Sequence, residues 1–420
     1  MPSCLGSMLA VLCALVALPA LAAVSVAPTA PATAPDWALD VLDFHGMPAD
    51  TRDRSFNIFF DAGAWHGYSL PPAGDAHSGF VGPFVHALAR GRWVGTRFAE
   101  VTLHAGATRL VLVETASQSG PGWLRRRFAG ASLSLTQTLF FVDGWRARVD
   151  VELVSTQARE LGIEVSATRF AGATTPLPDT DGALVEGFPG APGWRLATRF
   201  ALGEQALPLD AAPGRVSSGV LRRRLAPGEP LRLRIEQRLE EAGKPAPVVD
   251  AATAWAANRA RWDGYLRHAQ AVHLTGLDAA VARHVALKAI ETLVGNWRAA
   301  RGDLYHGGVV PSYSNPDFNG FWAWDAWKHA VALARFAPEL AKEQIRAMFD
   351  FQQADCMLVD AIFLDRRENN ARDSKPPLAG WAVLAVWQAT HDTDFLREMY
   401  PRLVAYHRWW GTNRDHDHDG

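Results

Sequence analysis

The most informative residues of this sequence alternate aromatic rings with one carboxylate and one ammonium group, in Phe321-Trp322-Ala323-Trp324-Asp325-Ala326-Trp327-Lys328. A sugar presents an apolar face of C–H bonds and a rim of hydroxyls, which proteins bind with indole rings and a few placed polar groups. Three tryptophans around Asp325 therefore predict a carbohydrate pocket. The alternative is a buried aromatic cluster at the start of a helix, with Asp325 as the helix cap.

A second polar group, Asn370, Arg372 and Lys375, lies in a loop just before a predicted helix. Its amide, guanidinium and ammonium groups are suited to donating hydrogen bonds to sugar hydroxyls. Arg372 and Lys375 could equally pair with Asp373 or Glu368 and hold the loop in place. The sequence leaves both interpretations open.

The last six residues, Asp415-His416-Asp417-His418-Asp419-Gly420, match the opening of a D-x-D-x-D-G calcium loop. Asp415, Asp417 and Asp419 occupy the first, third and fifth positions, and the glycine makes the sharp turn. Such loops close with a later acidic residue, so we expect this chain to be part of a longer protein. The alternatives are a solvated acidic terminus or a zinc site at the two histidines, which lacks two further ligands nearby.

Alternating residues predict the strands that must support these groups. Ala147, Val149, Val151 and Leu153 alternate with charged residues, and the segment 231–236 repeats the pattern. Clusters of Gly, Pro and Asp separate such runs. Residues 38–246 are therefore predicted to form an antiparallel β-sandwich, with the arginine run 125–127 on a solvated face.

After residue 246 the period changes to that of helices. Residues 247–275 are predicted to hold a linker helix, and 276–420 a series of helices. The expected helices are 277–300, 325–336, 338–353, 377–390, 394–400 and 401–414, several with proline at the start. Helix after helix behind a β-sandwich indicates about half of an α/α toroid, whose loops build a pocket.

The composition narrows the class of protein. A chain of 420 residues with 48% hydrophobic and 20% charged residues can form two folded domains. The formal net charge is −2, so the chain lacks the excess of positive charge typical of proteins that bind nucleic acid or anionic membranes. Of three cysteines only Cys356 follows the N-terminal segment, so no intrachain disulfide is expected in the mature chain.

The N-terminus resembles an export signal. The run 9–23 is apolar, too short to span a bilayer, and ends in small residues. We expect residues 1–23 to be a signal peptide and 24–37 a Pro/Ala linker, with the protein periplasmic or secreted. No later run is apolar enough to cross a membrane, so no membrane partner is expected after cleavage.

Several segments together resemble glycoside hydrolase family 63, in its exported bacterial branch related to processing α-glucosidase I. The resemblance runs from about residue 40 to the end and is specific in the order and spacing of its motifs. They are segments 59–67 (FFDAGAWHG), 288–298 (KAIETLVGNWR), 322–328 (WAWDAWK), 370–376 (NARDSKP) and 399–410 (MYPRLVAYHRWW).

The resemblance implies an N-terminal antiparallel β-supersandwich followed by the first half of an (α/α)6 barrel. It implies an inverting enzyme, whose catalytic acid and base lie on segments that would follow residue 420, so no catalytic residue is expected in this chain. Reading Asp325 as the general acid is the chemical alternative, since a carboxyl among indoles should have a raised pKa. The resemblance also implies structural calcium and no organic cofactor.

The resemblance further implies that one group of residues lines the glucose pocket: Trp322, Trp324, Asp325, Lys328, Asn370, Arg372, Lys375, Trp65 and His66. Trp65 and His66 would border it from a sandwich loop, or instead anchor the domain interface. The expected function is an inverting α-glucosidase acting on an oligosaccharide. The alternatives are a non-catalytic carbohydrate-binding module, or a trehalase-like hydrolase or phosphorylase on the same barrel.

Overall fold

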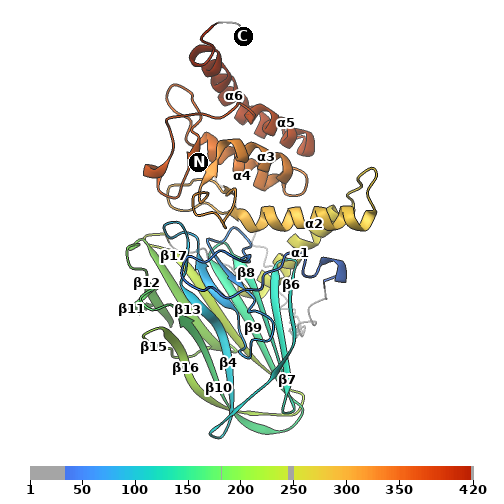
Figure 1. Cartoon of the computed structure of the whole chain (residues 1–420), viewed down its shortest axis with the longest axis vertical. Helices are drawn as coiled ribbons and strands as arrows, with labels where there is room; N and C mark the ends of the chain where they lie inside the picture. The colour runs from blue at the N-terminus through green and yellow to red at the C-terminus, as the bar shows by residue number, and fades with distance from the viewer. Residues whose placement is uncertain (1–33, 181, 245–249, 418–420) are drawn as a thin grey trace, which may run out of the picture. The chain divides into compact units, whose positions relative to one another are not determined.

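Two antiparallel sheets face each other in the first half of the chain, which confirms the predicted sandwich (Figure 1). The larger runs in the order β11 (Thr175–Thr180), β12 (Ala183–Gly187), β13 (Trp194–Leu202), β17 (Pro230–Glu241), β9 (Arg146–Ser155), β8 (Leu133–Asp143), β7 (Trp123–Gly130), β6 (Val113–Gly120), with β14 (Gln205–Ala206) on β13. The smaller runs in the order β15 (Asp210–Ala212), β16 (Arg215–Leu225), β10 (Arg159–Arg169), β4 (Gly95–Ala105), β5 (Thr108–Leu110).

This computed structural model describes residues 34–180, 182–244 and 250–417. The predicted signal segment 1–23 and residues 24–33 of the predicted linker lie outside them. A short helix η1 (Asp36–Ala38) precedes a small sheet of β1 (His66–Ser69), β2 (Val81–Val85) and β3 (Arg92–Trp93).

The core of the sandwich lies between the two sheets. Val149 and Val151 of β9 point toward it, as do Ile163 and Val165 of β10, and all four are buried. Because side chains alternate across a strand, the same period leaves Glu152 of β9 exposed. Burial of these residues stabilises the platform on which the helices rest.

The arginine run does not form the predicted solvated face. Arg125 and Arg126 are buried at 6% and 0% exposure. Arg126 donates to Glu114 Oε1 at 2.7 Å and to the carbonyl of Gly79 at 2.8 Å, because the segment before β2 covers this strand. The prediction is wrong for these two residues and holds only for Arg127, which is exposed.

The helical period after residue 246 is confirmed in α1 (Ala251–Gln270), α2 (Ala279–Asn296), α3 (Ala323–Leu333), α4 (Pro338–Phe349) and α5 (Ala379–Thr390). Helix α1 packs on β8, where the rings of Trp255 and Phe140 lie 4.8 Å apart. Helices α3, α4 and α5 contact one another and share one apolar core. None of the described helices combines the length and the apolar character that a membrane span requires.

The two helices expected at 394–400 and 401–414 are one helix, α6 (Thr393–Asn413), with Pro401 inside it. Proline removes one backbone hydrogen bond and usually ends or kinks a helix. Here Phe395 and Met399 before the proline, and Tyr406 and Trp409 after it, are all buried in the helical core. Packing on both sides of Pro401 keeps the helix continuous, so the prediction of a helix boundary at this proline is wrong.

Short strand pairs carry the loops between the helices. β18 (Trp297–Arg298) pairs with β19 (Gly308–Val309), and β20 (Phe321–Trp322) pairs with β21 (Ala361–Ile362). A 3-10 turn, η2 (Arg366–Glu368), follows β21. These pairs hold fixed the backbone on either side of the tryptophan motif.

The segment after β18 joins the helices to the sandwich. Ala299 donates its backbone N–H to the carbonyl of Gly63 at 2.9 Å and accepts from Trp65 Nε1 at 2.8 Å. Arg301 Nη2 donates to the carbonyl of Gly144 at 2.8 Å. We call these contacts the Ala299 junction.

Candidate functional site

The tryptophan motif straddles the end of a strand and the first turn of a helix. Trp322 pairs with Ala361 in the β20–β21 ladder, and Ala323 donates its N–H to the carbonyl of Asp360 at 2.7 Å. Helix α3 then begins at once, with Trp322 at its N-cap position and without a side-chain cap. Asp325 therefore does not cap the helix, and it lies instead in the first turn.

The helical period divides the motif into a buried and an accessible side. Ala323, Ala326 and Trp327 are buried in the helical core. Trp324 is 37% exposed, and the ammonium of Lys328 lies 4.0 Å from the centre of its ring. One indole thus supports the core, while the other offers a face beside a cation.

Asp325 is half-buried between these two sides. Burial raises the pKa of its carboxyl, while the ammonium groups of Lys328 and Lys375 oppose that rise. A carboxylate accepts hydrogen bonds from hydroxyls, so this arrangement can bind a sugar rim. The general-acid alternative for Asp325 stays a prediction.

Asp360, which the sequence analysis missed, lies at the centre of the loop contacts. It is 3% exposed, and its Oδ2 accepts from Asn370 Nδ2 at 2.9 Å and lies 3.5 Å from Lys375 Nζ. The backbone N–H of Asp360 also donates to the carbonyl of Asn370 at 2.9 Å. A carboxylate inside the apolar run 357–362 was the available signal, because a buried charge requires partners.

Several buried polar atoms in this region lack a partner among the described residues, and Trp327 Nε1 in the helical core is one of them. No described residue forms a hydrogen bond with Asp360 Oδ1 or with Trp322 Nε1. The ring of Trp322 meets Phe318 and Phe363 edge to face, at 5.5 Å and 6.4 Å between centres. A buried acceptor or donor without a partner is costly, so a water molecule, an ion or a polar ligand is needed to satisfy it.

The structure therefore brings together Trp322, Asp325, Asp360, Asn370 and Lys375, which we call the Trp322 cluster. Its loop contacts settle the pairing left open by the sequence. Lys375 pairs with Asp360 rather than with Asp373 or Glu368, and exposed Arg372 donates weakly to Asn370 Oδ1 at 3.4 Å.

A hollow borders the Trp322 cluster where the sandwich meets the helical loops. Its volume is about 250 Å³, and its lining includes His86, Trp194 and Glu241 from the sandwich and Asn319 and Phe363 from the loops. Because Phe363 also contacts Trp322, the hollow adjoins the tryptophan motif.

Trp65 and His66 lie apart from the cluster. Both are fully buried, and Trp65 stacks on His86 with 5.6 Å between ring centres. Together with its hydrogen bond to Ala299, this placement favours the interface-anchor interpretation for Trp65. Burial lowers the pKa of His66 to about 3, so its ring is neutral.

The predicted calcium ligands follow α6. Asp415 is half-buried and Asp417 exposed, whereas Asp419 lies outside the described residues. Within residues 34–180, 182–244 and 250–417, no group of three or more His, Cys, Asp or Glu side chains could hold a metal ion. The calcium loop stays a prediction.

Two segments match known families. Residues 44–172 match the family described as "Glucosidase YgjK, N-terminal". Residues 319–420, which include the Trp322 cluster, match "Mannosylglycerate hydrolase MGH1-like glycoside hydrolase domain". One match falls in the sandwich and the other in the helical region.

Two individual proteins are also similar. The uncharacterized protein YMR196W of Saccharomyces cerevisiae is 25% identical over 126 residues, which are 29% of this chain and 11% of the yeast protein. A solved structure, "Putative kojibiose phosphorylase from human microbiome", aligns with a TM-score of 0.51 and 8% identity over 82% of this chain and 56% of its own. The chain thus spans only part of both, and the second likeness shows the fold alone. The two family matches relate the chain to glycoside-hydrolase-like proteins, without singling out family 63.

Proposed function

We propose that this protein binds the terminal glucose of an α-linked glucoside at the Trp322 cluster and takes part in its hydrolysis with inversion. The observation that carries the proposal is the pair of buried atoms without partners, Asp360 Oδ1 and Trp322 Nε1, beside half-buried Asp325. Sugar hydroxyls can both donate to the carboxylate and accept from the indole. The accessible ring of Trp324 supplies a stacking face.

Inverting hydrolysis needs an acid and a base carboxyl about 6.5–9.5 Å apart, with water between the base and the sugar. We assign neither role to a described residue, and the proposal gives Asp325 and Asp360 the task of binding. Lys375 and Asn370 would hold the Asp360 carboxyl oriented.

Calorimetric titration of the purified chain with maltose tests the binding step. We expect Asp325→Asn to lower the affinity by about ten- to a hundredfold, since hydrogen bonds to a charged group contribute about 1.5–3 kcal/mol. Asp394→Asn is the matched control, because Asp394 also lies in the first turn of a helix, α6. Equal affinity of the Asp325 variant and the unchanged chain would refute the proposed site.

A second pair of variants tests whether the ring of Trp324 stacks on the sugar. Trp324→Ala should weaken maltose binding, whereas Trp381→Ala on α5, where the ring is 48% exposed, should not. A loss of affinity in both variants would indicate a non-specific effect of removing an indole.

A second candidate is phosphorolysis of the same glycosidic bond. It is favoured by three cations, half-buried Lys375 in the cluster and exposed Lys328 and Arg372 next to it in sequence, which suit a phosphate ion. Comparing sugar release with and without inorganic phosphate decides between the two reactions. Release of a sugar phosphate only when phosphate is present would replace hydrolysis with phosphorolysis.

We also propose that the protein is exported, from the apolar segment 9–23 and the small residues that end it. N-terminal sequencing of the protein from the periplasm or culture medium tests this. A chain that keeps Met1 and stays in the cytoplasm would refute it.

A further inference from the structure

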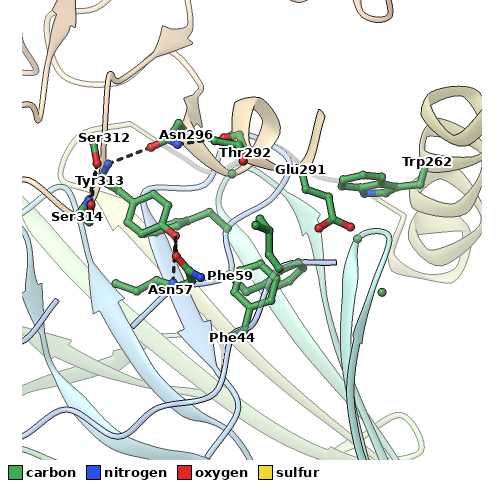
Figure 2. A pocket seen from close by; sticks show the side chains of 16 residues that line it. Phe44, Asn57, Phe59, Trp262, Glu291, Thr292, Asn296, Ser312, Tyr313 and Ser314 are labelled. Carbon is green, nitrogen blue, oxygen red and sulfur yellow. Dashed lines mark hydrogen bonds between the residues drawn. The ribbon is translucent and has the colours of Figure 1, made fainter. Parts of the chain in front are cut away.

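A separate cavity of about 170 Å³ lies between the sandwich and the first two helices (Figure 2). Phe44 and Phe59, from the segment before β1, form its floor, and Trp262 of α1 stands on one side. Glu291 of α2 enters from above, and Tyr313 lies across from it (Figure 2). None of these residues belongs to the Trp322 cluster.

Internal hydrogen bonds fix the far wall of the cavity. The hydroxyl of Tyr313 donates to Asn57 Oδ1 at 3.4 Å, and its backbone N–H donates to Asn296 Oδ1 at 2.9 Å. Asn57 and Asn296 donate in turn to the carbonyls of Asp43 and Thr292. The wall is thus built before any ligand arrives, as small-molecule sites generally are.

Glu291 supplies the one carboxyl among the residues that line the cavity, and it accepts a hydrogen bond from the backbone N–H of Leu42. Its carboxyl points toward the rings of Phe44 and Phe59 (Figure 2), and no described Lys, Arg or His forms an ion pair with it. The charged groups around it are Asp40, on the loop before β1, and Asp61, which is fully buried and held by Arg261 Nη2 at 2.6 Å. Asp61 is thus paired with a guanidinium, while Glu291 has no such cation among the described residues.

The surroundings keep a proton on Glu291. Burial raises the pKa of the Glu291 carboxyl to about 8, and the charges of Asp40 and Asp61 act in the same direction. At neutral pH the group therefore both donates and accepts hydrogen bonds. An anionic ligand would meet the repulsion of two carboxylates.

We propose that this cavity, the Glu291 cavity, binds one uncharged sugar ring or ring-sized polyol at a site separate from the Trp322 cluster. A cavity of about 150 Å³ admits the six-membered ring of benzene, and this cavity is slightly larger at about 170 Å³. The aromatic floor faces the C–H side of the ring, and Glu291 meets its hydroxyls. This site does not depend on the proposed function.

Fluorine NMR of the full chain labelled with 5-fluorotryptophan tests the proposal with D-glucose as the probe. Trp262→Phe and Trp324→Phe identify the resonances that report the two sites. We expect glucose to shift the Trp262 resonance in the unchanged chain and in Asp325→Asn. No shift of Trp262, or a shift that Asp325→Asn abolishes, would overturn the separate site.

Variants of Glu291 test its contact with the ligand. Glu291→Gln keeps a donor and an acceptor and should retain the affinity, whereas Glu291→Leu should lower it about tenfold, the effect of losing about 1.4 kcal/mol of hydrogen bonding. Thermal melts establish that both variants fold. Unchanged affinity in Glu291→Leu overturns the proposal, and so does a Trp262 shift given by D-glucosamine but not by D-glucose, which would mark a cation site.

Discussion

The buried carboxylate of Asp360 contacts two polar residues of the neighbouring loop, Asn370 and Lys375. Its two oxygens have different surroundings, since Oδ2 meets Asn370 and Lys375 while Oδ1 has no partner among the described residues. The first oxygen orders the loop, and the second is the buried atom that the proposed sugar hydroxyl would meet. In the proposed site, the residue would connect the position of the loop to the binding of a hydroxyl.

Replacing Asp360 should separate these two tasks. Asp360→Asn keeps the size of the side chain and one carbonyl oxygen but removes the charge, so we expect maltose affinity to fall about tenfold. Asp360→Leu should lose binding and also loosen the loop that holds Asn370. Calorimetric titration measures the first effect, and proteolysis between residues 366 and 376 measures the second. Full affinity in Asp360→Leu would contradict the role given to this carboxylate.

His66 predicts a response to acid. Its pKa is about 3 in the folded chain and about 6.5 in an unfolded one, so below pH 6.5 the unfolded chain binds the additional proton. The free energy of unfolding should fall by about 2 kcal/mol from this residue between pH 6.5 and pH 5. Burial lowers the pKa of His86 too, which adds in the same direction.

Denaturant titrations at pH 7 and pH 5 measure this loss. In His66→Phe, whose ring can pack on Tyr68 and Phe141 as the imidazole does, the loss should be smaller than in the unchanged chain. Equal losses in both chains would show that His66 does not titrate as the structure indicates.

At the scale of elements, the start of α6 connects two helices. Asp392 accepts from the backbone N–H groups of Asp394 and Phe395, both at 3.0 Å, and thereby caps α6. The same carboxylate accepts from Lys342 Nζ of α4 at 2.7 Å. These hydrogen bonds, that of Lys342 foremost, lower the pKa of Asp392 to about 2.

Two substitutions distinguish the cap from the ion pair. Asp392→Asn keeps a capping oxygen and should lower the melting temperature less than Asp392→Ala, which loses both interactions. Since the folded pKa lies below the unfolded one, the carboxylate stabilises the chain above about pH 4, and this contribution disappears as the pH falls toward 2. Calorimetry at pH 7 gives the order of the two variants, and a larger loss in Asp392→Asn would contradict it.

The sequence predicted the elements well where one face of a strand or helix is apolar, as in β9 and α4. It erred at Pro401, because buried residues on both sides of α6 outweigh a local helix breaker. Of the predicted site residues, Asp325, Asn370 and Lys375 lie around Asp360 and Trp322, and their contact with a sugar stays a prediction. Asp360 was missed because its neighbours are apolar, and Trp65 was placed ambiguously because a motif does not reveal burial.

At the scale of the whole chain, the Ala299 junction makes the sandwich and the helices depend on each other. Trp65 is fully buried there, and its ring fills the space between His86 and the backbone of Ala299. The buried guanidinium of Arg298 adds a hydrogen bond of 3.2 Å to His86. Loss of this packing should lower the stability of both the sandwich and the helical region.

Truncating Trp65 should therefore uncouple the two regions. Trp65→Ala leaves a cavity and should lower the free energy of unfolding by about 3–5 kcal/mol. We expect calorimetry to resolve two transitions in the variant, at a lower temperature than in the unchanged chain. Trp381→Ala, at an exposed site, should leave the transition in place. An unaltered melt of Trp65→Ala would contradict the importance of the junction.

Gly63, with a φ of +77°, would place an added Cβ 2.8 Å from the backbone nitrogen of Ala299. Gly144 is similarly confined, since its Cβ would lie 3.0 Å from the carbonyl oxygen of Ala62. Exchange of the sandwich between related proteins must therefore transfer Gly63 and Gly144 together with Ala299. An exchanged segment with larger residues at positions 63 and 144 would bring side chains into a space that has room only for backbone atoms.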